Sequence, residues 1–228
     1  MKILECEQGG AEWFDARMGV PTGSRFCDIV SPTGKPRSGL TPRRYLMELL
    51  GERLTLQPAD HPDTDAMRRG TALEPKAREW YSFATGRAVE QVGFVKSDCG
   101  RWGVSPDGLM TDRGLEIKCP LTPTFLEIAE SGKLPDDHFV QVQAGLWVTR
   151  MPAWDYVIWT DTRGLSPVII TVEPSTDVFA GLDKALPEFC DTLDAMEAKM
   201  RAAGHGYTPP PVDEGPSWDE IIGKVTVA

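Results

Sequence analysis

Apolar residues recur at helical spacing in several stretches of the chain. The longest stretch is 175–203, where apolar residues at every third or fourth position predict one long amphipathic helix. The other predicted helices cover residues 12–18, 22–30, 41–54, about 63 or 65 to 85, 122–132 and 136–149. Local signals agree with these limits, since a Thr-Pro pair begins the helices at Thr41 and Thr122, and Gly19 and Gly86 end two others.

Strand-like alternation of apolar and polar residues appears between these helices. The predicted strands are 88–96, 101–104 continuing into 107–110, 114–118, 154–160 and 168–172. In 114–118 the period of two places Glu116 and Lys118 on one face and Leu115 and Ile117 on the other. The segment 154–160 is too apolar for an outer edge. This order of elements predicts an α/β (α+β) fold with a mixed central β-sheet flanked by helices.

A chain of 228 residues most simply forms one domain. We expect this domain to cover residues 1–205, followed by a Pro-rich tail over 206–228. The tail is either disordered or a docking segment, in which Trp218, Ile221 and Ile222 would form an amphipathic turn suited to a partner or a neighbouring subunit. No apolar run reaches membrane-spanning length, and the start of the chain lacks a signal-peptide pattern. The five cysteines contain no C-x2-C pair, which favours reduced thiols in the cytoplasm over a zinc or iron–sulfur site.

The net charge of −10 argues against a nucleic-acid partner until its distribution is considered. Residues 17–53 contain seven basic and three acidic side chains, a balance of +4, whereas residues 173–228 contain four basic and eleven acidic ones, a balance of −7. The sequence thus predicts a basic end and an acidic end. An enzyme that must release DNA can be acidic overall if its groove is basic. Alternatively, Arg43, Arg44 and Arg53 only solvate a helix face.

Two carboxylates with eight residues between them form the centre of the candidate chemistry. Asp107 stands at a tight turn between a proline and a glycine, and Glu116 lies in the strand that follows. If adjacent strands pair, the carboxylates converge and repel each other, and Mg²⁺ or Mn²⁺ removes the repulsion. Lys118, one pleat away, would reach a metal-bound water or a phosphate. The structural alternative is a common Pro-Asp-Gly turn before a half-exposed strand.

The motif P-D-x8-E-x-K resembles the signature of the PD-(D/E)xK nuclease superfamily, and further motifs narrow the resemblance. They are Arg17-Met18-Gly19 with Thr22-Gly23-Ser24, Arg69-Gly70-x3-Glu74, Ser105-Pro106-Asp107-Gly108, Glu116-Ile117-Lys118-Cys119-Pro120, and Gln141-x-Gln143 with Trp147-Val148-Thr149. With these motifs in this order, the chain is similar over roughly residues 10–160 to the lambda exonuclease group, the YqaJ-type viral recombinase nucleases.

The resemblance implies a restriction-endonuclease-like core and a Mg²⁺-dependent exonuclease in which Mn²⁺ can substitute. Such an enzyme digests the 5′ strand of a duplex DNA end processively, releases 5′-mononucleotides and leaves a 3′ overhang for phage-type recombination by single-strand annealing. It also implies a ring-shaped homotrimer around the DNA and a partner annealing protein that receives the overhang. The expected setting is the cytoplasm of a bacterium, with the protein encoded by the bacterium or a phage.

For the metal site, the resemblance implies that Asp107, Glu116 and the main-chain carbonyl of Ile117 bind the ions. Glu74 would support the second ion directly or through water. Lys118 would orient the attacking water and help to deprotonate it. Hydrolysis would proceed by a two-metal mechanism without a covalent intermediate.

Two residues of the predicted helix 136–149 complete the implied catalytic group. Gln141 would hold the attacking water or the metal shell. His138 lies one turn earlier and therefore faces the same way. In this position the family can carry a tyrosine, so we expect His138 to line the site and to assist proton transfer.

The resemblance also implies a grip on the terminal 5′ phosphate by Arg17, Ser24 and Ser105. The chain departs from the family pattern here, because the family has a second arginine shortly after Lys-Cys-Pro and this chain reads Leu121-Thr122-Pro123-Thr124-Phe125. Either the phosphate pocket is weaker or another residue, such as Arg25, takes that place. Trp13 belongs to the core or stacks on DNA bases near the bound end.

Two other functions are compatible with parts of the pattern. A non-catalytic DNA-end binder would keep the basic residues but would not need Glu74, Asp107, Glu116 and Lys118 together. An endonuclease of the same fold would need all four, and the sequence distinguishes it poorly from an exonuclease. An iron–sulfur helicase-type nuclease is disfavoured, because its cysteines are missing.

Overall fold

The computed structural model describes residues 1–59 and 64–208. Trp218, Ile221 and Ile222, with nearly all of the expected tail, lie outside the described residues. The elements in chain order are β1 (Lys2–Leu4), α1 (Ala11–Arg17), the 3-10 helix η1 (Gly23–Asp28), α2 (Leu40–Thr55), α3 (Asp65–Thr85), β2 (Phe94–Lys96), β3 (Gly103–Val104), β4 (Gly108–Leu109), β5 (Gly114–Lys118), α4 (Thr122–Ser131), α5 (Asp136–Thr149), β6 (Trp154–Ile158), β7 (Val168–Val172) and α6 (Thr176–Ala202). No helix in this described part is both long and apolar enough to cross a membrane.

The described strands form two sheets instead of one central sheet. β1, β2 and β3 form an antiparallel sheet, and β4, β5, β6 and β7 form a second sheet in that order. In the second sheet β5 and β6 run parallel, whereas the two outer pairs are antiparallel. The mixed character and the flanking helices are therefore as predicted. The predicted strand through 101–110 is divided between the two sheets, with β3 in the first and β4 in the second.

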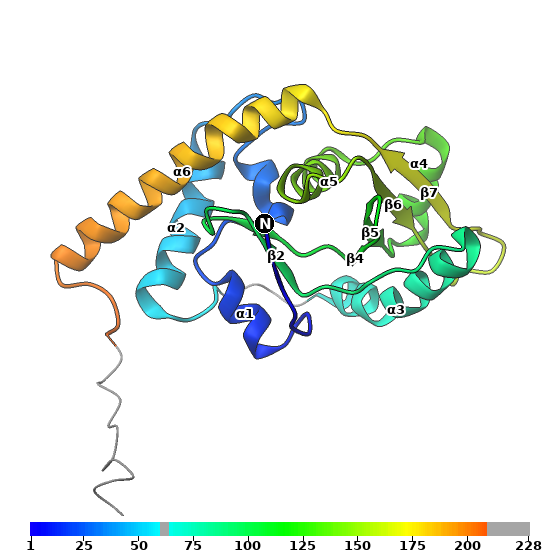
Figure 1. Ribbon diagram of the computed structural model, residues 1–228, viewed down its shortest axis with the longest axis horizontal. Coiled ribbons are helices and arrows are strands. Elements are labelled where there is room, and N and C mark those ends of the chain that lie inside the picture. Colours follow the sequence, from blue (N-terminus) through cyan, green and yellow to red (C-terminus); the bar gives the residue numbers. More distant parts are fainter. Residues whose placement is uncertain (60–63, 209–228) are drawn as a thin grey trace, which may run out of the picture.

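The β4–β7 sheet lies between two helices, α5 on one face and α3 on the other (Figure 1). Leu115 and Ile117 of β5 pack against Tyr81 and its neighbours on α3. The alternation along β5 then directs Glu116 and Lys118 to the opposite face, toward α5. The period of two predicted for this strand is confirmed, and it separates the core residues from the charged ones.

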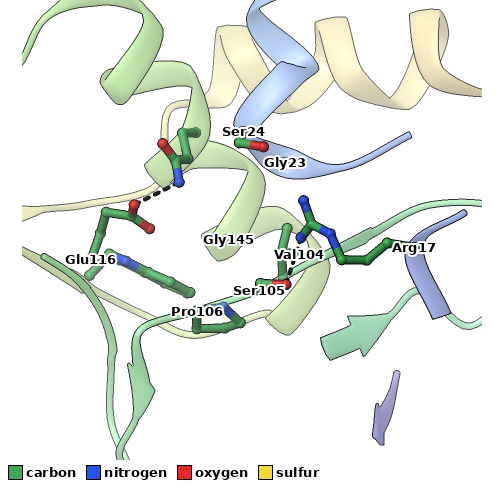
Figure 2. Close-up of a pocket in the computed structure, with 10 residues that line it drawn as sticks. Arg17, Gly23, Ser24, Val104, Ser105, Pro106, Glu116 and Gly145 are labelled. Atoms are coloured by element: carbon green, nitrogen blue, oxygen red, sulfur yellow. Dashed lines mark hydrogen bonds between the residues drawn. The ribbon is translucent and has the colours of Figure 1, made fainter. Parts of the chain in front are cut away.

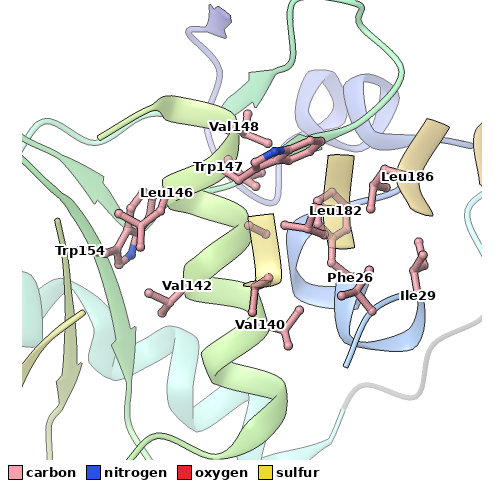
Figure 3. Close-up of a cluster of buried hydrophobic side chains, with 14 of the residues drawn as sticks. Phe26, Ile29, Val140, Val142, Leu146, Trp147, Val148, Trp154, Leu182 and Leu186 are labelled. Atoms are coloured by element: carbon pink, nitrogen blue, oxygen red, sulfur yellow. The ribbon is translucent and has the colours of Figure 1, made fainter. Parts of the chain in front are cut away.

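Helix α5 occupies the centre of the molecule. It contacts η1 and α6 on one side and strands of both sheets on the other. Its second half consists almost entirely of buried residues: Val140, Val142, Gln143, Ala144, Gly145, Leu146, Trp147, Val148 and Thr149. Figure 3 shows the α5 side chains facing Phe26 and Ile29 at η1 and Leu182 and Leu186 of α6. A helix that is apolar on nearly all sides is typical of a buried central position.

The basic and acidic stretches of the sequence meet in the fold. Arg53 of α2 places Nη1 2.6 Å from Asp194 Oδ1 and 3.2 Å from Glu197 Oε2 of α6. Arg101, between β2 and β3, lies 2.8 Å from Asp191 and 2.7 Å from Asp194 through Nη2. The expected separation into a basic end and an acidic end is therefore wrong for this part of the molecule, because α2 packs against α6.

Three local features of the fold differ from the sequence prediction. β1 is not predicted, because three residues are too few to show a period of two. In place of the α-helix predicted over 22–30, Gly23–Asp28 form the short 3-10 helix η1, and the Thr22 side chain makes no capping hydrogen bond. The Thr22 N–H instead donates to the Tyr45 hydroxyl at 2.9 Å. Of the predicted strand 88–96, only Phe94–Lys96 forms a strand, while Glu90 makes one isolated bridge to Leu109.

The packing around Gly145 predicts a large effect of a small substitution. A Cβ atom there would lie 2.6 Å from Cη2 of the buried Trp154 ring. We expect Gly145→Ala to lower the free energy of unfolding by about 1–3 kcal/mol, because the indole has no room to move aside. Gly51→Ala in α2, where the added carbon meets nothing within 4 Å, is the matched control and should be neutral or stabilising. Urea unfolding measures both variants, and equal effects would contradict the packing argument.

Candidate active site

Asp107 is held against β5 by main-chain hydrogen bonds. Its N–H donates to the Leu115 carbonyl at 3.1 Å, and its Oδ2 accepts from the Ile117 N–H at 2.6 Å. Gln8 supports the turn by donating from Nε2 to the Pro106 carbonyl at 2.8 Å. The Asp107 Oδ1 atom has no hydrogen-bond partner within the described residues. The Pro-Asp-Gly turn thus places a buried carboxylate beside β5 with one oxygen free.

Glu116 lies on the face of β5 that points toward α5 and is buried. Its Oε1 accepts from Lys118 Nζ at 2.8 Å and from Gln141 Nε2 at 2.6 Å. Oε2 has no partner in residues 1–59 and 64–208. Two donors from different elements therefore fix the carboxylate, and again one oxygen stays free.

Glu74 of α3 supplies a third carboxylate. It is hydrogen-bonded to Arg78, one turn later on the same helix. Arg78 also donates from Nε to the main-chain carbonyl of Asp107 at 2.9 Å, which ties α3 to the Asp107 turn. Arg78 is absent from the residues that the motifs single out. Its i,i+4 spacing from Glu74 is the sequence signal for such a pair.

Burial and neighbouring charge disfavour the ionised forms of Asp107 and Glu74. Burial, together with the charges of Glu116 and Glu74, raises the pKa of Asp107 well above its usual value. Burial also raises the pKa of Glu74, with Arg78 opposing this effect and Glu116 adding to it. Burial opposes the charge on Lys118, but the Glu116 and Asp107 carboxylates outweigh it and raise the pKa of Lys118. Lys118 is therefore a cation at neutral pH and donates hydrogen bonds.

These groups line one open cavity of about 490 Å³. The predicted site residues in its wall are Trp13, Arg17, Ser24, Glu74, Ser105, Asp107, Glu116, Ile117, Lys118, His138 and Gln141. Arg69 also lies in the wall, where Nη1 donates to the Cys119 carbonyl at 2.9 Å and to the Pro120 carbonyl at 3.3 Å. Arg69 therefore holds the end of β5, a role that its motif alone does not indicate.

One side of the cavity has the chemistry of an anion site. Arg17 Nη1 donates to Ser105 Oγ at 2.7 Å, and the guanidinium lies 4.0 Å from the centre of the Trp13 ring. Trp13 Nε1 donates to the same oxygen at 2.9 Å, which leaves the Ser105 hydroxyl hydrogen free to donate. Figure 2 shows Arg17 reaching Ser105, with Ser24 and Glu116 bordering the same pocket. Trp13 thus supports Arg17, and its stacking on DNA bases stays a prediction.

Arg17 and Arg25 differ in their charge partners. Arg17 forms no ion pair with a carboxylate of the described residues, and burial lowers its pKa to about 10, so it remains a cation at neutral pH. Arg25 lies 2.6 Å from Asp28 through Nε and 2.9 Å from Glu48 through Nη1, outside the cavity wall. The structure therefore leaves Arg17 available to an external anion and does not bring Arg25 to the site.

Helix α5 contributes polar residues with different roles. Gln141 bonds Glu116, and His138 places Nδ1 2.7 Å from the hydroxyl of Tyr156 on β6. Gln143 points away into the core, where it donates to a main-chain carbonyl and accepts from a main-chain N–H of the segment before α6, each at 2.8 Å. The Gln-x-Gln motif thus combines one residue of the site with one residue that anchors α6.

The model of the YqaJ-like viral recombinase domain matches residues 12–152 of the chain. The chain belongs to this family. A crystal structure of an alkaline exonuclease from Laribacter hongkongensis is 30% identical, with a TM-score of 0.77 over 86% of this chain and 98% of that chain. The complex of that exonuclease with dAMP has a TM-score of 0.76 at the same identity and coverage.

A more distant structure shares the fold of this YqaJ-like protein. The phage-related exonuclease from Haemophilus somnus 129PT is 12% identical, with a TM-score of 0.61 over 79% of this chain and 96% of that chain. A search of curated protein sequences finds no significant match. The family and fold implied by the sequence motifs are thereby confirmed.

The YqaJ-like site fits a divalent cation with few protein ligands. Within the described residues, no group of three or more His, Cys, Asp and Glu side chains is placed to hold a metal ion. Mg²⁺ commonly takes one or two carboxylates and completes its coordination with water and substrate phosphate. Asp107 and Glu116 each offer a free oxygen, and a cation between them would relieve the repulsion that raises the pKa of Asp107.

The raised pKa of Asp107 predicts a change in stability with pH. A carboxyl whose pKa is higher in the folded state makes the fold less stable as the pH rises from the unfolded toward the folded pKa, because the folded state resists ionisation. We expect metal-free Asp107→Asn, which keeps an acceptor for the Ile117 N–H, to melt higher than the wild type at neutral pH. The expected rise is at least about 2–4 °C, the effect of 1 kcal/mol in a domain of this size.

Thermal unfolding in the presence of a chelator measures this difference. Asp15→Asn, at an exposed position of α1, is the control and should leave the melting temperature unchanged. A lower melting temperature for Asp107→Asn would contradict the electrostatic account.

Proposed function

We propose that this YqaJ-like protein is a metal-dependent exonuclease that digests the 5′ strand of duplex DNA ends and leaves a 3′ overhang. The observation that supports it most is a single cavity in which Asp107, Glu116 and Lys118 lie together with Arg17 and Ser105, a pair suited to a terminal phosphate. Likeness to an alkaline exonuclease over 86% of the chain supports the same activity. The dAMP complex of that exonuclease is consistent with DNA as the substrate.

Asp107, Glu116 and the main-chain carbonyl of Ile117 would hold Mg²⁺, or Mn²⁺ in its place, and Glu74 would support a second ion. When bound, the two ions would supply an activated water and charge stabilisation at the leaving 3′ oxygen. The protein keeps the carboxylates oriented for this task. The Ile117 N–H holds Asp107, and Arg78 holds Glu74 while also bonding the Asp107 carbonyl.

Lys118 and Gln141 would act beside the attacking water. Both donate to Glu116 Oε1, which keeps their polar atoms next to the carboxylate. As a cation, Lys118 orients a water or a phosphate oxygen by donating hydrogen bonds. Lys118 can accept a proton from the water only after it has released its own proton to solvent, and Glu116 and Asp107 oppose that release by raising its pKa as long as their negative charge is not neutralised.

Recognition of the terminal phosphate would set the direction of digestion. Arg17 and the hydroxyls of Ser105 and Ser24 provide donors for a 5′ phosphate, and hydrogen bonds to a charged acceptor are among the strongest. The residues directly after Pro120 (121–125) contain no arginine, and Arg25 is paired with two carboxylates elsewhere. The preference for a phosphorylated end therefore depends on Arg17.

The proposal also covers the oligomeric state of the protein and a partner protein. A ring-shaped homotrimer around the duplex would make digestion processive, and a single-strand annealing protein would receive the 3′ overhang for phage-type recombination. Membership of a viral recombinase family supports this context.

Linear duplex DNA with one 5′-phosphate end and one 5′-hydroxyl end, each 5′ strand carrying its own label, tests the activity. We expect Mg²⁺-dependent loss of the 5′ strands and release of mononucleotides, while nicked and closed circles are largely spared. Glu116→Gln keeps an acceptor for Lys118 and Gln141 but removes the charge. It should lower the rate on the order of 10²–10⁴-fold, the range for a catalytic group.

Denaturing gels distinguish the alternatives. Cleavage of the closed circle would replace the exonuclease by an endonuclease of the same fold. Tight binding of DNA ends without any Mg²⁺-dependent loss of a strand would leave only a DNA-end binder.

The contrast between Arg17 and Arg25 predicts how substitution of each changes the preference for a 5′-phosphate end over a 5′-hydroxyl end. Arg17→Gln should reduce digestion from the phosphorylated end by about 10–100-fold, the effect of one charge-assisted hydrogen bond of 1.5–3 kcal/mol. Arg25→Gln should leave the ratio of rates at the two ends unchanged, because its guanidinium is paired with Asp28 and Glu48. A loss of end preference in Arg25→Gln would instead show that Arg25 leaves its carboxylates to bind the phosphate.

A further inference from the structure

A hydrogen bond between His138 and Tyr156 connects the cavity wall to the core. His138, on the first turn of α5, lines the cavity, whereas Tyr156 on β6 is fully buried. The Nδ1 atom and the phenol oxygen are 2.7 Å apart, and the ring centroids are 5.7 Å apart. Tyr156 belongs to none of the sequence motifs, and the mechanism proposed above does not use it.

The position of the hydrogen in this bond follows from the other partners of each group. The Tyr156 hydroxyl has no second hydrogen-bond partner among residues 1–59 and 64–208. If Nδ1–H were the donor, the phenol hydrogen would be buried without an acceptor, which is unfavourable. Imidazole nitrogen is also a better acceptor than phenol oxygen, and phenol O–H is a better donor than neutral imidazole N–H. Nδ1 therefore accepts, and a neutral ring must carry its proton on Nε2.

Both rings are neutral under the conditions in which DNA would bind. Burial, with a further contribution from the charge of Lys118, lowers the pKa of His138 to about 4, although Asp137 opposes this effect. Burial and the nearby Glu116 and Asp137 carboxylates raise the pKa of Tyr156 above its usual value. At neutral and alkaline pH the question is thus which tautomer is present, not whether the imidazole is charged.

The other edge of the imidazole is free to meet a ligand. Nε2 has no hydrogen-bond partner in the part of the chain that the structure describes. Its neighbours in the cavity wall include Lys118 and Gln141, which are also donors. A set of donors on one wall suits the two non-bridging oxygens of a phosphodiester, which share one negative charge.

We propose that Tyr156 fixes His138 in the Nε2–H tautomer, so that the imidazole donates a hydrogen bond to a phosphate oxygen of the DNA strand in the cavity. This inference rests on the proposed nuclease function and deepens it. Tyr156 is then a positioning residue. His138 is a donor to the substrate and not the base that removes a proton from the attacking water, which revises the proton-transfer role expected from the sequence.

Histidine NMR tests the tautomer without any need for activity. The chain has three histidines, so the two-bond ¹H–¹⁵N signals of His138 can be assigned by comparison with His138→Gln. In the metal-free full-length protein we expect a protonated Nε2 and an unprotonated Nδ1. Tyr156→Phe should give a mixture of tautomers, whereas Tyr207→Phe, which removes an exposed hydroxyl, should change nothing. An Nδ1–H tautomer in the wild type would overturn the proposal.

The same signals test the ligand. Addition of a short 5′-phosphorylated duplex without Mg²⁺ should shift the Nε2–H signal of the wild type, and no shift would overturn the donation to phosphate. A folded wild type that gives these NMR results but digests no DNA would refute the proposed function and leave the tautomer and its phosphate contact standing.

Kinetics then separate a donor from a base. His138→Gln retains an N–H donor and His138→Leu does not. The kcat of the Leu variant should therefore be at least about tenfold lower than that of the Gln variant, which is less than the loss of about 10²–10³-fold on removal of one preorganised donor in other enzymes. Tyr156→Phe should lower kcat with little change in KM. Equal losses in the Gln and Leu variants would indicate that His138 acts as a base and would overturn the proposal.

Discussion

Three carboxylates around one cavity repel one another, and the candidate site depends on how the fold contains that repulsion. Asp107 accepts a main-chain N–H of β5, Glu74 is held by an arginine one turn along α3, and Glu116 accepts from an ammonium and an amide. Each carboxylate therefore has its own donor from a different source. The arrangement keeps negative charge concentrated where a cation would be stabilising, and it explains why β4, β5, α3 and α5 must meet at one place.

The arginines differ in whether a carboxylate of the same chain neutralises them. Arg25, Arg53 and Arg101 are paired with carboxylates of the same chain. Arg17 instead lies on an indole ring and bonds a serine hydroxyl, with no carboxylate partner in the described residues. A net charge of −10 is therefore a poor guide to the ligand, because several cations are paired within the chain while Arg17 in the cavity wall forms no ion pair with the described residues.

Helix α5 joins the hydrophobic core to the candidate site. Its first half carries His138 and Gln141 into the cavity, while its second half is buried between η1, α6 and the sheets. Gly145 allows the Trp154 ring to lie directly against the helix. Polar groups on a helix packed in this way have little freedom to move, which is the condition under which hydrogen bonds to a substrate are effective.

The amino-acid sequence alone determined the class of fold, the limits of β5, α5 and β7, and the chemical character of the Asp107–Lys118 segment. These features depend on periodicity, capping and turn residues, which act between near neighbours in the chain. Only the tertiary structure decided that Arg25 is paired away from the cavity, that Arg78 bridges two carboxylate-bearing elements, and that a buried phenol holds His138. Such contacts join residues far apart in sequence, as in the bond between Arg17 and a serine 88 positions later, and no local pattern records them.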